Sequence, residues 1–89
     1  MGNAIDLDCG IALHRITNWL DHELVLPTGD DGWIFSEGPH TCYIQATPLE
    51  PRTIATVSIE RTRLTAHGDP EALAVFEKLF TLRFISAGG

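Results

Sequence analysis

The hydrophobic pattern predicts a helix near the start of the chain. Between residues 7 and 24, apolar side chains recur at spacings of three and four, which is typical of one helix face. They are Cys9, Ala12, Leu13, Ile16, Trp19 and Leu20. Pro27 ends this helix or the turn that follows it, because proline cannot continue a helical hydrogen-bond ladder.

The middle of the chain changes to a period of two. Residues 27–32 are rich in proline, glycine and aspartate and predict a turn, and residues 33–37 predict a short strand. In residues 41–47, Cys42, Ile44 and Ala46 alternate with polar neighbours. Such alternation indicates an antiparallel sheet with one buried and one solvated face.

Residues 48–51 contain two prolines and predict a loop, since proline is excluded from central strands. Residues 53–66 are β-rich but long for one strand, and their apolar positions change phase. Val57 and Ile59 are odd-numbered, whereas Leu64 and Ala66 are even. We therefore expect a bulge near Arg61 or Thr62, which would restore the buried face.

The second helix has the clearest start. Asp69 is the predicted N-cap, Pro70 the first helical residue, and Glu71 lies in the first turn. The apolar arc that follows is wider than a helix on one small sheet requires, so its surplus should meet the first helix or another subunit. The arc contains Ala72, Leu73, Val75, Phe76, Leu79, Phe80 and Leu82. Residues 82–89 have no clear helix or strand pattern.

These elements predict one α+β domain over residues 1–89, in the order α-β-β-β-α. The simplest arrangement is a three- to four-stranded antiparallel sheet with both helices packed on one face. The pattern leaves the order of strand pairing open.

Charge and composition narrow the function. Six basic and twelve acidic residues give a net charge of −6, which opposes binding to nucleic acid or anionic membranes. The apolar stretches are too short to span a membrane, and the first ten residues do not resemble a secretion signal. We therefore expect a cytoplasmic protein in which Cys9 and Cys42 are reduced and buried.

No catalytic, metal or cofactor motif is evident. The four histidines, His14, His22, His40 and His67, lack the paired spacing of zinc ligands. The cysteines occupy apolar positions, where a thiol is normally inert. We predict no catalytic residue, no metal and no cofactor, which favours a non-enzymatic role without excluding an enzyme.

Two short segments resemble known families. Gly38, Pro39 and His40, before a central strand, resemble the minor-groove loop of double-stranded-RNA-binding domains. That family has a basic cluster at the start of its last helix, where this chain has Asp69, Pro70 and Glu71. These residues would repel phosphate, so we predict no RNA binding.

The terminal Gly88 and Gly89 resemble the tail of ubiquitin-like sulfur carriers. The resemblance implies that an enzyme adenylates the terminal carboxylate, which then becomes a thiocarboxylate. Those carriers begin with a β-hairpin, whereas a helix is predicted first here. A frayed chain end is the interpretation we prefer for this glycine pair.

The candidate interaction residues are arginines and aromatics. Arg61 and Arg63 share a strand face, with Arg52 near the strand's other end; carboxylates of the same chain or of a second subunit are their expected partners. Trp33 and Tyr43 are candidates for a partner-binding surface, although packing explains them equally well. Our leading hypothesis is a non-catalytic homodimeric module that binds another protein or a small ligand. The alternative is a sulfur carrier.

Overall fold

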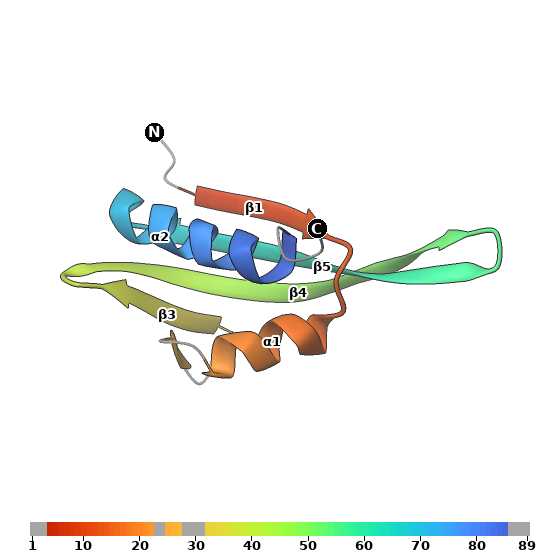
Figure 1. Cartoon of the computed structure of the whole chain (residues 1–89), viewed down its shortest axis with the longest axis horizontal. Helices are drawn as coiled ribbons and strands as arrows, with labels where there is room; N and C mark the ends of the chain where they lie inside the picture. The colour runs from red at the N-terminus through yellow and green to blue at the C-terminus, as the bar shows by residue number, and fades with distance from the viewer. Residues whose placement is uncertain (1–3, 23–24, 28–31, 86–89) are drawn as a thin grey trace.

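The computed structural model of the chain describes residues 4–22, 25–27 and 32–85. Its first half contains strand β1 (Ala4–Cys9), helix α1 (Leu13–His22) and strands β2 (Val25–Pro27) and β3 (Gly32–Glu37). Two long strands follow, β4 (His40–Ile54) and β5 (Val57–Gly68). The last elements are helix α2 (Pro70–Phe80) and a π-helical segment, η1 (Thr81–Ile85) (Figure 1).

The strands form one antiparallel sheet in the order β1-β5-β4-β3-β2. The predicted α+β class is therefore confirmed. The predicted order α-β-β-β-α corresponds to α1, β3, β4, β5 and α2. To these the structure adds β1 and the three-residue β2, so the described residues form five strands.

The first predicted helix begins too early, because residues 7–9 belong to β1. In this segment Ile5, Leu7 and Cys9 alternate with Asp6 and Asp8, and the apolar residues are the less exposed ones. Period-two alternation places them on one face of a strand. The pairing of β1 with β5 then decides between strand and helix in this segment.

Buried residues of the sheet and of both helices form a single core. Cys42, Ile44 and Ala46 of β4 are buried, in agreement with their predicted alternation. Trp19 of α1 contacts Phe76 and Phe80 of α2, with ring centroids 5.9 Å apart in both pairs. Part of the surplus apolar arc of α2 is thus covered by α1, while Leu79 and Leu82 are exposed.

The predicted start of α2 is correct, but the Asp69 carboxylate has another role. It accepts a hydrogen bond from the backbone N–H of Thr41 at 3.1 Å and does not cap the helix. The Asp69 N–H also donates to the Thr41 carbonyl at 2.9 Å. These two bonds attach the start of α2 to β4.

Strands β4 and β5 extend well beyond their neighbours. The last residue of β4 that pairs with β3 is Gln45, and the first residue of β5 that pairs with β1 is Thr62. The two strands continue as a hairpin that turns at Ala55 and Thr56. Residues 50–60, which we call the arm, are all exposed and project from the body (Figure 1).

The arm corrects two predictions. The predicted loop over residues 48–51 is part of β4, because β3 has ended and Pro48 and Pro51 lie on an edge strand, where proline is tolerated. The predicted bulge near Arg61 or Thr62 is also wrong. The irregularity lies in β4, where the three-residue step from Leu49 to Arg52 faces a two-residue step in β5.

Candidate interaction surface

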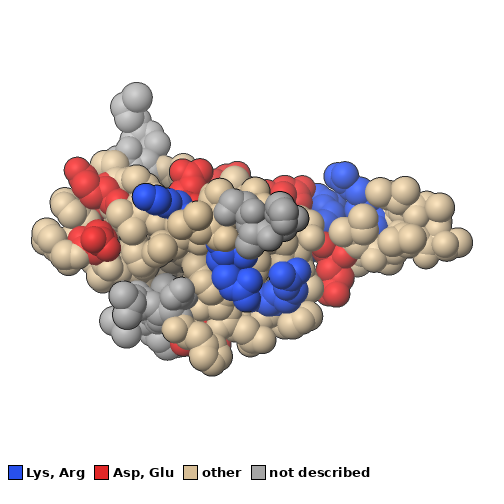
Figure 2. Space-filling model, viewed as in Figure 1, with Lys and Arg blue, Asp and Glu red and all other residues tan. Residues whose placement is uncertain are grey.

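The arm presents an apolar face to solvent. Ile54, Val57 and Ile59 have exposed fractions of 56%, 58% and 37%. Ile54 lies opposite Val57, and Ile59 lies opposite Arg52, so the strand alternation places all four on one face of the hairpin. Residues 53–59 carry no charge. Figure 2 shows this largely uncharged projection, with charged side chains at its root.

A pocket lies at the root of the arm. Its volume is about 340 Å³. It is lined by Asp8 and Gly10 at the end of β1 and by Arg52, Ile54, Ile59 and Arg61 from the hairpin. Two of the predicted interaction residues, Arg52 and Arg61, therefore come together beside the apolar face.

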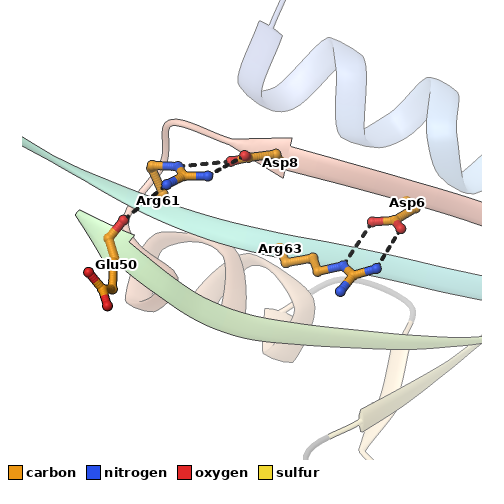
Figure 3. Close-up of polar contacts among 5 residues, drawn as sticks. All are labelled: Asp6, Asp8, Glu50, Arg61 and Arg63. Carbon is orange, nitrogen blue, oxygen red and sulfur yellow. Dashed lines mark hydrogen bonds and ion pairs between the residues drawn. The ribbon is translucent and has the colours of Figure 1, made fainter. Parts of the chain in front are cut away.

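Arg61 connects three strands at this root (Figure 3). Its Nε donates to Asp8 Oδ1 on β1 at 3.2 Å, and a terminal nitrogen donates to Asp8 Oδ2. Its other terminal nitrogen donates to the Glu50 carbonyl on β4 at 3.2 Å. Glu50 lies within the irregular part of β4, so Arg61 holds the backbone where the arm begins.

Arg63 forms a second ion pair on the same face (Figure 3). It donates two hydrogen bonds to Asp6, at 3.0 Å and 2.7 Å. Hydrogen bonds from Arg63 and Arg61 hold the pKa of Asp6 and that of Asp8, respectively, below the ordinary value. Both arginines are thus engaged with carboxylates of their own chain.

The two aromatic candidates lie on opposite faces of the sheet. Trp33 is in the core, only 9% exposed, and its Nε1 donates to Asp21 at 3.0 Å. Tyr43 is half-buried on the other face, opposite His67, with ring centroids 5.5 Å apart. Its ring covers Gly32, where any Cβ would collide with it. Neither residue lines the pocket at the arm root.

The remaining candidate features are less informative. Gly88 and Gly89 lie outside the described residues. Among residues 4–22, 25–27 and 32–85, no three metal-ligating side chains gather into a possible site. No helix in the described part of the chain is long and apolar enough to cross a membrane.

Both cysteines are free and buried. Burial raises the pKa of the Cys9 thiol, and it raises that of Cys42 to about 11, with the nearby charge of Asp69 adding to the effect. A thiol with a raised pKa is a poor nucleophile near neutral pH. Neither cysteine has the environment of a reactive centre.

The apolar arm residues were not predicted as a surface. Val57 and Ile59 were expected on a buried face, because apolar residues in a strand normally point to a core. The change of phase between Ile59 and Leu64 was the available signal. It marks the point where the strand leaves the core.

The protein-family models, the curated proteins and the solved structures contain no match to this chain.

Proposed function

We propose that the protein is a non-catalytic interaction module that docks a protein partner through its arm. The observation that supports the proposal is the exposure of Ile54, Val57 and Ile59 on a hairpin that has left the core. An isolated two-stranded hairpin is at best marginally stable in water, and a third strand or a packing surface stabilises it. A partner that covers the arm supplies this support.

Apolar area favours docking at the same place. Complete burial of a Val or Ile side chain contributes about 1.5–3 kcal/mol. Three such side chains together supply a useful part of the free energy of association. The uncharged run over residues 53–59 carries no charge to desolvate, so burying its side chains avoids that cost.

We further propose that the protein acts as a homodimer in the cytoplasm. A small domain gains buried surface by self-association, and the arm offers a surface for it. The two free, buried cysteines are compatible with a reducing compartment.

The test is a comparison of immobilised baits in lysate of the native host, with retained proteins identified by mass spectrometry. The arm variant Ile54→Thr/Val57→Thr keeps β-branched side chains but removes apolar surface. The control Thr53→Ser/Ser58→Thr changes the pair of residues on the opposite arm face. We expect the wild type and the control to retain the same partner, and the arm variant to lose it.

Retention of the same partner by all three baits would contradict docking through the arm. A fourth bait without Gly88 and Gly89 tests the sulfur-carrier alternative, which remains a prediction from the sequence. That alternative requires an adenylating or sulfur-transfer enzyme that binds only the baits with an intact terminus.

A further inference from the structure

The two edges of the arm differ in their capacity to add a strand. The β4 edge contains Pro51, with Pro48 just before the arm, and neither proline has an N–H to donate. The β5 edge from Val57 to Arg61 lies beyond the end of β1 and contains no proline. A strand added to the arm would therefore pair with β5, in line with β1.

We propose that the occupant of this edge is the same segment of a second copy, residues 57–61, paired antiparallel with its counterpart. The inference rests on the proposed docking function of the arm and names its partner. The two hairpins together form a four-stranded sheet. Each copy then supplies the additional strands that the other's hairpin lacks.

The length of the free edge fixes the register. The edge is bounded by the turn at Thr56 and by Thr62, which already pairs with β1, so its central residue is Ile59. Two-fold symmetry places Ile59 opposite Ile59 of the second copy. Glu60 then lies opposite Ser58, and Arg61 opposite Val57.

Charge favours the same register. A ladder centred on Glu60 would place two carboxylates directly opposite each other, which is destabilising, and would extend into the part of β5 held by β1. The register centred on Ile59 opposes no like charges. It also aligns Ile59 of both copies as an apolar cross-strand pair.

The pocket at the arm root fits this arrangement. Residues directly opposite in a ladder share a face, so Val57 of the second copy lies on the face of Arg61 and Ile59. The pocket lined by Asp8, Gly10, Ile59 and Arg61 is on that face, beside the free edge. An apolar side chain of the second copy enters a pocket that one chain alone leaves open.

Disulfide trapping tests the register directly. Opposite residues in an antiparallel pair have Cα atoms about 4.5–5.5 Å apart, within disulfide range. Ile59→Cys should therefore crosslink two full-length chains under mild oxidation. The matched control is Ile54→Cys on β4, which three strand spacings of about 4.8 Å separate from its counterpart. Native Cys9 and Cys42 are buried, so they compete little with the introduced cysteine for disulfide formation.

We expect a covalent dimer from Ile59→Cys and none from Ile54→Cys. Sedimentation equilibrium should give a dimer for the wild type and a monomer for Ile59→Lys. Circular dichroism of each reduced variant checks its fold, and Ile59 is partly exposed, so these substitutions leave the core intact.

Equal crosslinking of both cysteine variants, or a wild-type monomer at every concentration, would overturn this inference. The proposed docking function survives either result if the Ile54→Thr/Val57→Thr bait still loses a partner that the wild type retains. The proposed docking function itself fails if the Ile54→Thr/Val57→Thr bait retains every partner that the wild-type bait retains.

Discussion

The Asp8 carboxylate is bonded by Arg61, although the residue directly opposite Asp8 in the β1–β5 ladder is Arg63. Arg63 in turn bonds Asp6, so the two ion pairs run diagonally across the sheet. The diagonal arrangement brings Arg61 close enough to the arm root to donate to Glu50 as well. One guanidinium thereby connects the body of the sheet to the start of the arm.

Replacing Arg61 should loosen the arm. Arg61→Gln removes the bonds to Asp8 and the Glu50 carbonyl, so amide hydrogen exchange over residues 50–60 should become several-fold faster. Arg61→Lys keeps the positive charge but loses the forked guanidinium, so its amide exchange rate should be intermediate. The matched control is Arg63→Gln, which breaks an equivalent ion pair without a bond to β4. Equal acceleration by the Arg63 control would contradict a specific role for Arg61.

Acid should weaken the β1–β5 face. The pKa values of Asp6 and Asp8 are lowered in the folded protein, so the unfolded chain binds protons more readily. Their stabilising contribution is complete above the ordinary aspartate pKa of about 3.9 and is lost as the pH falls through the lower folded values. Urea midpoints measured from pH 7 to pH 2 should show this loss. In Asp6→Asn/Asp8→Asn the acid slope should be shallower; an unchanged slope would show that other groups control it.

Gly68 should be intolerant of a side chain. Its φ of 145° is a conformation that favours glycine, and an added Cβ would lie 2.6 Å from the Thr41 carbonyl oxygen. We expect Gly68→Ala to lower the free energy of unfolding by about 3 kcal/mol through strain and collision. The control Gly38→Ala has a positive φ but open space around it, and should lose about 1 kcal/mol. Urea denaturation measures both, and similar losses would contradict the collision.

Local sequence signals predicted the elements whose causes are local. The alternation through Cys42, Ile44 and Ala46 identified part of β4, because a pleated strand always separates neighbouring side chains. Asp69 and Pro70 located the start of α2. Of the surface candidates, Arg61 and Arg63 pair with carboxylates of the same chain, which is one of the two kinds of partner expected for them. Each of these inferences depends on residues near one another in the sequence or on opposite charge.

The features that the sequence did not predict depend on the residues at which neighbouring strands end. Cys9 fits the helical spacing with Leu13 and Ile16 as well as it fits a strand, and only pairing with β5 decides between them. Pro48 is acceptable in β4 because β3 stops pairing at Gln45, which no local pattern reveals. The arm follows from the same non-local fact, since Ile59 is exposed where its neighbouring strand is absent.

The native thiols should be almost unreactive. Burial raises the pKa of Cys9 and that of Cys42, to about 11, so little thiolate exists near neutral pH. A colorimetric disulfide reagent should react slowly with the native protein and rapidly in urea. Ser58→Cys, on the exposed arm, is the control and should react at once. Fast native reaction at Cys9 or Cys42 would contradict their burial. Because the folded pKa is raised, the associated stability is complete below the ordinary thiol pKa and declines as the pH rises toward 11.

Thr62, just beyond the arm on β5, connects this strand to the turn before α1. Its side chain is fully buried, and its hydroxyl donates to the Ile11 carbonyl at 2.7 Å. Thr62→Val preserves shape but removes the donor, leaving a buried carbonyl without this partner. We therefore expect a loss of about 1–3 kcal/mol in the free energy of unfolding.

The control for this prediction is Thr65→Val on the same strand. Thr65 is half-buried and alternates to the opposite face of the sheet, so its substitution should change stability by less than about 0.5 kcal/mol. Urea unfolding of the two variants isolates the hydrogen bond from the effect of valine on β-propensity. Because Thr62 is the first β5 residue paired with β1 and lies opposite Cys9, Thr62→Val should also speed amide exchange at Gly10 and Ile11. Equal stability of the two variants would mean that the hydrogen bond from the Thr62 hydroxyl does not stabilise the fold.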